Sequence, residues 1–132
     1  MTGPRFVFLS RSFSDSPSDH RDVAARKVTW MALSPNSRPL GKAATWYDDV
    51  DECRAGVMRL RESLDDLHVA IVVTRGRWVW RADRDGEPIA VSVRDYLRQH
   101  ECDYNVRRFL EAVPTATLPA VVRAVRSGSC TP

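Results

Sequence analysis

Apolar residues recur along two stretches of the chain at alternating steps of three and four, which is the spacing of one face of an α-helix. The first stripe comprises Val50, Cys53, Val57, Leu60, Leu64 and Leu67. The second comprises Cys102, Val106, Phe109 and Val113. Its helix should end before Pro114, because proline lacks the amide donor that a helix needs. Both stripes must face a hydrophobic core.

Runs rich in β-branched and aromatic residues predict strands around these helices. Asp85-Gly86 is a strong signal for a tight turn between two of the strands, and Asn36-Ser37 holds the equivalent place earlier in the chain. Pro119 interrupts the last run, which suits an edge strand or a strand end. The runs are 6–9, 68–74, 77–82, 87–95 and 115–122.

The chain contains an internal repeat with an offset of 49 residues. At this offset Tyr47 aligns with Tyr96, and Cys53 aligns with Cys102. Each copy reads as strands followed by a helix, with repeat one at about 27–67 and repeat two at about 68–118. A copy of this size alone buries too little apolar surface to be stable. We therefore predict that the 132 residues form a single domain, with both copies in one sheet.

The hairpin at Asp85-Gly86 allows its two faces to be assigned, since side chains alternate along a strand. A two-residue turn would oppose Ala82 with Ile89, Trp80 with Val91 and Trp78 with Val93 on the core face. On the other face it would place Arg81 beside Ala90, Val79 beside Ser92 and Arg77 beside Arg94.

The candidate binding residues are therefore Arg77, Arg81 and Arg94, on the open face of the sheet. Two arginines directly opposite each other are unfavourable unless an anion lies near them. Guanidinium groups suit phosphates, carboxylates or an acidic protein surface. The alternative is a solvated face on which Asp83 or Asp95 acts as a local ion-pair partner.

The charge balance leaves the partner open. Twenty basic and 17 acidic residues give a net charge of +3, which is too small to imply a polyanion by itself. Binding to nucleic acid would need exposed aromatic rings among the arginines. Because Trp30, Trp78 and Trp80 are expected in the core, only Trp46 could supply one.

No residue pattern points to catalysis, a cofactor or a metal. His100 and Cys102 are two apart on a predicted helix and do not face each other. Cys53 and Cys102 lie on the apolar stripes, and Cys130 lies in the tail. This odd cysteine count, without the spacings of a disulfide framework or zinc site, fits a reducing cytoplasm. The acidic cluster Asp48, Asp49, Asp51 and Glu52 lacks a calcium-loop pattern and is interpreted as helix capping.

The remaining segments are polar or short. The Ser-rich stretch 10–21 is expected to be a flexible loop and 127–132 a loose tail. No apolar run approaches the roughly 20 residues that cross a bilayer. We therefore expect neither a membrane segment nor a secretion signal.

From about Lys27 to Leu118, as two tandem copies, the chain resembles the YegP-like family of small bacterial proteins of unknown function, most specifically in the second copy. The likeness rests on a Trp-rich strand, a turn and strand, a closing tyrosine, two helical residues and the helix exit: Trp78-Val79-Trp80, Asp85-Gly86-Glu87-Pro88-Ile89, Tyr96, Cys102 and Asn105, and Ala112-Val113-Pro114-Thr115-Ala116. The first copy departs at Ser37, in place of the turn glycine, and at Gly56, in place of Asn105. The resemblance implies an α+β fold in which two units of three strands, a helix and a strand share one antiparallel sheet, with strands exchanged between the halves. It implies no activity. Packing of the two copies is expected to place both helices on one face.

We therefore predict an α+β protein that acts in the cytoplasm as a non-catalytic binding or interaction module, without a cofactor. Its partner would be a protein or a small anionic ligand held by Arg77, Arg81 and Arg94. The alternatives are an accessory protein for nucleic acid and an enzyme with a site between the repeats. The repeat permits both a monomer and a homodimer.

Overall fold

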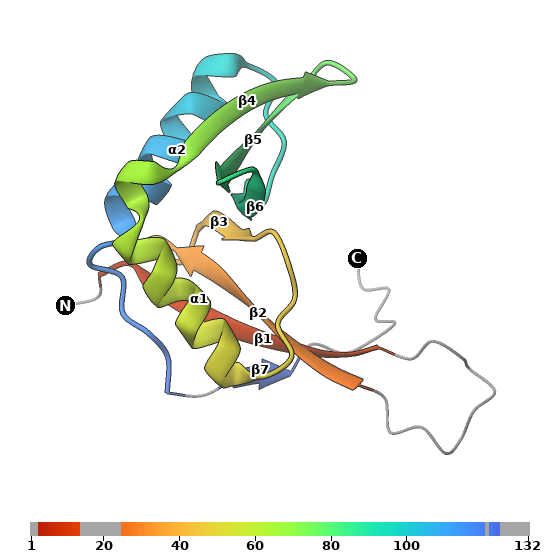
Figure 1. Cartoon of the computed structure of the whole chain (residues 1–132). Helices are drawn as coiled ribbons and strands as arrows, with labels where there is room; N and C mark the ends of the chain where they lie inside the picture. Colours follow the sequence, from red (N-terminus) through yellow and green to blue (C-terminus); the bar gives the residue numbers. More distant parts are fainter. Residues whose placement is uncertain (1–2, 14–24, 121, 125–132) are drawn as a thin grey trace.

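A computed structural model describes residues 3–13, 25–120 and 122–124 and has the α+β architecture expected from the sequence. Three strands are followed by a helix, and the same order then occurs again (Figure 1). The elements are β1 (Arg5–Phe13), β2 (Ala25–Leu33), β3 (Pro39–Ala43), α1 (Val50–Glu62), a 3-10 turn (Leu64–Asp66), β4 (His68–Thr74), β5 (Arg77–Arg84), β6 (Glu87–Val91), α2 (Gln99–Ala112) and β7 (Val122–Ala124).

The strands form one sheet in the order β4-β5-β6-β3-β2-β1-β7. The two halves of the chain meet where β3 pairs with β6, at Lys42 opposite Val91 and Ala43 opposite Ala90. The sheet is antiparallel from β4 to β1, as expected. The short β7 is the exception, because it runs parallel to β1. The division into repeats at 27–67 and 68–118 stays a prediction.

Both helices pack on the same side of the sheet (Figure 1), and Phe109 of α2 joins the two halves of the core. Its ring stacks on Trp30 at a centroid distance of 6.1 Å and tilts against Trp80 at 5.0 Å. Gly41 of β3 lies directly beneath it, since an added Cβ would come within 2.7 Å of the Phe109 ring. Strand β3 can approach this closely only because Gly41 has no side chain.

The hairpin turn is as predicted, but the register beyond it is not. Asp85 and Gly86 both have positive φ, 50° and 83°, as a type I′ turn requires. A β-bulge then shifts the pairing by one residue, so that Arg81 lies opposite Val91 and Ala82 opposite Ala90. The expected pairs of Trp80 with Val91, Ala82 with Ile89 and Arg81 with Ala90 are therefore wrong.

The bulge has a local cause in each hairpin. Pro88 has no amide hydrogen with which to continue the ladder, and proline inside a sheet is confined to edges and bulges. In the other hairpin Leu33 pairs with Pro39 while Ala32 pairs with Gly41, so one residue is again skipped. The shift places Ser92, rather than Val91, against the backbone of Trp80, where Ser92 N donates to Trp80 O at 3.0 Å.

Two further expectations are corrected by the strand limits. Residues 10–13 of the Ser-rich stretch belong to β1, and residues 14–21 lie outside the described part. The run 115–122 is not one strand: Thr117 forms a single bridge with Arg5, and β7 begins only at Val122, after Pro119. The tail 127–132, with Cys130, also lies outside the described residues.

Candidate anion-binding site

The three arginines singled out from the sequence do not form one patch. Arg77 pairs with Asp95 at 3.6 Å and Arg81 with Asp83 at 3.0 Å, so both have the local carboxylate partners that the sequence alternative named. Arg94 is not opposite Arg77, because Trp78 bridges to Tyr96 instead. The chain continues beside β5 after β6 ends at Val91, and Arg94 lines a cavity whose lining includes neither Arg77 nor Arg81.

Arg94 instead lines a cavity of about 410 Å³ between the turn that joins β2 to β3 and the first part of α2. Two further arginines from different elements reach the same cavity: Arg38 precedes β3 and Arg108 lies on α2. The polar side chains in its wall include Arg38, Arg94, His100, Glu101, Tyr104 and Arg108.

Ser34 fixes the turn that carries Arg38. It is buried, and its hydroxyl accepts a hydrogen bond from the Arg38 amide at 3.0 Å. The Ser34 amide donates a hydrogen bond to the Arg38 carbonyl at 2.9 Å. Ser37 has a positive φ of 66°, and its amide donates a hydrogen bond to Ser34 O. Because the backbone of the turn is tied at both ends, the position of Arg38 is set by the fold.

The opposite wall is held by α2. Asn105 Oδ1 accepts a hydrogen bond from the buried Trp80 indole Nε1 at 2.6 Å, which ties the helix to β5. One turn along the helix, Arg108 donates to the Tyr104 hydroxyl at 3.1 Å, and its guanidinium lies 5.8 Å from that ring. Tyr104 is 61% exposed, so the Tyr104–Arg108 pair presents an aromatic ring and a cation together.

The cavity wall carries uncompensated positive charge. Arg38, Arg94 and Arg108 make no ion pair with any residue in the described ranges, although Glu101 lies in the same wall. Burial raises the pKa of the Tyr96 hydroxyl, and the positive charge of Arg94 partly opposes that rise.

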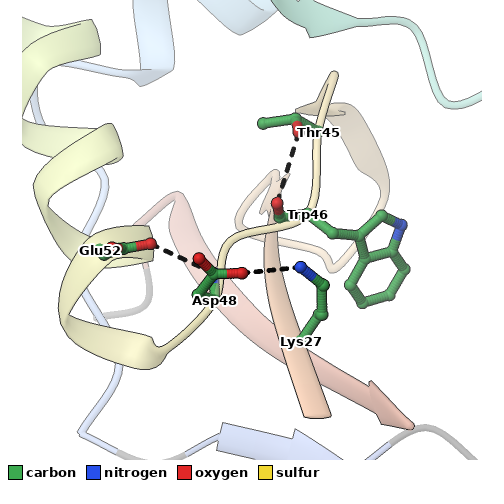
Figure 2. A network of polar contacts seen from close by, with 5 residues as sticks. All are labelled: Lys27, Thr45, Trp46, Asp48 and Glu52. Atoms are coloured by element: carbon green, nitrogen blue, oxygen red, sulfur yellow. Dashed lines mark hydrogen bonds and ion pairs between the residues drawn. The ribbon is translucent and has the colours of Figure 1, made fainter. Parts of the chain in front are cut away.

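The acidic cluster caps α1, as predicted. Asp49 is the N-cap, and its carboxylate accepts from the Glu52 amide at 2.8 Å. Figure 2 shows Asp48 between Lys27 and Glu52: its carboxylate pairs with Lys27 Nζ at 2.7 Å, and its amide donates to Glu52 at 3.3 Å. The carboxylates of Asp48, Asp49 and Glu52 thus all have partners within the fold.

The cysteines and tryptophans occupy mostly the places expected of them. Cys53 and Cys102 are fully buried, and burial raises the pKa of both thiols, that of Cys53 to about 12. Trp30 and Trp80 are buried, whereas Trp78 is only half-buried rather than a full core residue. Within residues 3–13, 25–120 and 122–124, no group of three metal-ligating side chains comes together. No helix in that part of the chain has the length and apolar character to span a bilayer.

The structure also gives two arginines of α1 contacts that the pattern did not reveal. Arg54 and Arg61 are both half-buried. The Arg54 guanidinium lies 5.2 Å from the Phe8 ring, and that of Arg61 lies 5.8 Å from Phe6. These contacts support the fold and lie apart from the residues that line the cavity.

Two solved structures match the whole architecture. Over 95% of this chain and 97% of the other, it superposes on the solution structure of yegP from E. coli, a protein of unknown function, with a TM-score of 0.60 and 11% identity. A UPF0339 protein from Shewanella oneidensis matches 95% of each chain with a TM-score of 0.61 and 11% identity. The chain has the YegP fold. No family model and no curated protein sequence matches it, so the likeness to YegP concerns the fold, which the resemblance in the sequence predicted.

Sequence reasoning found Arg94 but missed Arg38, Tyr104 and Arg108. The helical spacing of Tyr104 and Arg108, four apart, was a usable signal, because residues at that spacing are neighbours on a helix. Nothing in the sequence could bring Arg38 to them, since that contact depends on how the turn between β2 and β3 lies against α2. The cavity is therefore a product of the tertiary fold.

Proposed function

We propose that the protein is a non-catalytic binding module of the cytoplasm that holds a small anionic ligand in the cavity between the β2–β3 turn and α2. The observation that carries this proposal is the convergence of Arg38, Arg94 and Arg108 on one cavity without an ion-pair partner in the described ranges. Like charges gathered by separate elements repel one another, and a bound anion removes that repulsion.

The lining favours a ligand with a phosphate or carboxylate group and a flat ring. Guanidinium groups bind either anion through paired N–H donors. The exposed ring of Tyr104 offers a stacking surface beside them. A volume of about 410 Å³ falls within the range of small-molecule sites. The Glu101 carboxylate in the same wall would select against ligands with more negative charge than the arginines can balance.

The chemistry of the wall supports binding rather than catalysis. The Tyr96 hydroxyl is protonated at neutral pH, and burial raises its pKa further, so it is a hydrogen-bond donor rather than a base. Asn105 offers an amide whose oxygen is already engaged by Trp80. The thiols of Cys53 and Cys102 are buried and unpaired, which supports a reducing compartment.

The test is a titration with a defined probe, phenyl phosphate, followed by the amide chemical shifts of the protein, with inorganic phosphate and benzyl alcohol as separate controls. We expect phenyl phosphate to shift the amides of the β2–β3 turn and of α2. A matched pair of triple variants separates the cavity from general charge, because each removes three arginines. The cavity variant is Arg38→Ser, Arg94→Ser, Arg108→Ser, and the control variant is Arg77→Ser, Arg81→Ser, Arg107→Ser.

The cavity variant should lose at least about tenfold in affinity, equivalent to about 1.4 kcal/mol, while the control variant changes by less than about twofold. Equal losses in both variants would overturn the cavity proposal. A loss confined to the control variant would instead favour the open face of the sheet around Arg77 and Arg81. No shift with phenyl phosphate or phosphate would also reject the site.

The nucleic-acid alternative is tested by a separate titration with single-stranded DNA. Binding of single-stranded DNA would weaken steeply with added salt, since phosphate contacts release counterions. We expect no such binding, because Trp30 and Trp80 are buried and a single exposed ring such as Tyr104 cannot stack the successive bases of a strand. Strongly salt-dependent binding of DNA that is lost in the cavity variant would replace the small-ligand proposal.

A further inference from the structure

Among the described residues, strand β4 forms one outer edge of the sheet, since the strand order places it at the end, beside β5. Its seven residues, His68–Thr74, read HVAIVVT and contain no lysine, arginine, acid or proline. Natural edge strands are normally blunted by such residues or by a bulge, because their free backbone groups invite another strand. Every residue of β4 is in regular register with β5, so no bulge interrupts it.

Apolar side chains remain exposed on both faces of this edge. Val72, on the open face of the sheet opposite Val79, is 45% exposed. Val73, on the helix side opposite Trp78, is 50% exposed. The same strand also contributes Ile71, which packs against the core opposite Trp80. An edge with exposed valines on both faces is a surface that another strand would cover.

The two ends of β4 carry opposite charge. Asp65 and Asp66 lie in the 3-10 turn just before the strand, and both are exposed. Arg75 and Arg77 lie just after it, around the turn into β5, and are also exposed. The edge is therefore acidic at its start and basic at its finish. An antiparallel copy of the same edge presents the opposite order of charge.

We infer that β4 is a dimerisation edge, whose occupant is β4 of a second copy of this chain in antiparallel orientation. Full overlap of the seven residues fixes the register, with Ile71 opposite Ile71 of the second copy. Val72 then lies opposite Ala70 and Val73 opposite Val69 of the second copy, so both exposed valines are covered. Asp65 and Asp66 come near Arg75 of the second copy at each end of the dimer interface, while Arg77 lies one strand further in, on β5.

The charge pattern excludes the other orientation. A parallel pair would place acid beside acid and base beside base, which is unfavourable across strands. The antiparallel pair is isologous and closed by a twofold axis, so it ends at two chains and does not extend into a fibre. The sheets of the two copies then form one continuous sheet across the dimer interface. This joint uses none of Arg38, Arg94 and Arg108, so it stands or fails independently of the anion site.

The first experiment is sedimentation equilibrium over a range of protein concentrations. We expect a reversible approach to twice the chain mass of 14.9 kDa. Val72→Lys should weaken association at least about tenfold, because it puts a charge in the middle of the joint. Met58→Lys is the matched control, since Met58 is equally exposed at 42% but lies on α1. Circular dichroism is the check that both variants keep the fold.

A charge exchange tests the orientation directly. The chain Asp65→Arg, Asp66→Arg has two basic ends, and the chain Arg75→Asp, Arg77→Glu has two acidic ends. Each alone should be monomeric, while an equimolar mixture should form a heterodimer in which both ends attract.

Four results would overturn the inference. They are a wild-type chain that stays at 14.9 kDa at every concentration, equal effects of Val72→Lys and Met58→Lys, dimers in either charge variant alone, and a mixture that does not associate.

Discussion

The indole nitrogen of Trp80 donates to Asn105 Oδ1 at 2.6 Å, across the interface between β5 and α2. The Trp80 side chain is 1% exposed, so this bond satisfies a donor that has no access to water. Asn105 also stands in the wall of the anion cavity. The Asn105 side chain thus holds α2, which carries Tyr104 and Arg108, against the buried Trp80.

Removing that acceptor should destabilise the fold. Asn105→Ala leaves the Trp80 indole N–H buried without a partner, which costs about 1–3 kcal/mol in the free energy of unfolding. Chemical denaturation followed by tryptophan fluorescence measures the loss. Asn105→Asp keeps an oxygen at the same place and should retain most of the stability. Equal losses in the two variants would show that the hydrogen bond contributes nothing.

The first half of the chain, as far as the structure describes it, lacks the equivalent hydrogen bond. Trp30 matches Trp80 but has Gly56 where the second half has Asn105. The space above Gly56 is filled by Tyr47, whose hydroxyl would lie 2.5 Å from an added Cβ. Trp30 Nε1 makes no hydrogen bond of ordinary geometry within the described residues. Burial raises the pKa of the Tyr47 hydroxyl, and the nearby Trp30 indole partly opposes that rise.

Gly56→Ala should therefore lower stability in spite of its better helix propensity. Alanine in a helix interior is favoured over glycine by about 1 kcal/mol, but the contact with Tyr47 forces overpacking that costs about 1–3 kcal/mol. The thermal midpoint should fall. Ala55→Gly, at the exposed neighbouring position, calibrates the propensity difference in the same helix. A rise in the midpoint for Gly56→Ala would show that Tyr47 moves away freely.

The elements of the fold could be predicted because their signals are local. The steps of three and four place Cys53, Val57 and Leu60 on one face of α1, and Asp85-Gly86 demands a tight turn. The bulges were also within reach of the sequence. Pro39 and Pro88 stand at equivalent places in the two hairpins, and a proline there is a reason to expect one skipped residue.

The candidate site could be predicted only in part, because it depends on contacts between distant segments. The sequence placed Arg94 beside Arg77 through an uninterrupted ladder, and the bulge invalidates that ladder. The approach of Arg38 to α2 follows from the packing of two hairpins and a helix. Likewise the parallel pairing of β7 reflects where the chain can return after Pro119, which no local pattern encodes.

Arg61 of α1 should contribute far more to stability than its exposed neighbour. Its Nε donates to Val113 O at 3.1 Å and its Nη2 to Ala116 O, so one guanidinium satisfies carbonyls at the exit of α2. Arg61→Ala should cost about 2 kcal/mol, as expected for hydrogen bonds to a charged group. Arg59→Ala should stay within about 0.5 kcal/mol. Urea denaturation measures the free energy of unfolding of both variants. Equal losses of stability in the two would contradict the role assigned to Arg61.

The buried thiols should make the fold sensitive to alkali. Burial holds the pKa of Cys53 at about 12 in the folded chain, above the ordinary value of 9.0 that it regains on unfolding. The folded state then keeps a proton that the unfolded state releases, so stability is complete below about pH 9 and falls toward pH 12, by at most about 1.4 kcal/mol per pH unit for one thiol. Cys53→Ala should flatten this slope in urea titrations across that range.

In a Cys130→Ser background, neither Cys53 nor Cys102 should react with a thiol reagent until denaturant is added, and rapid reaction of the native chain would show that the core opens at these residues.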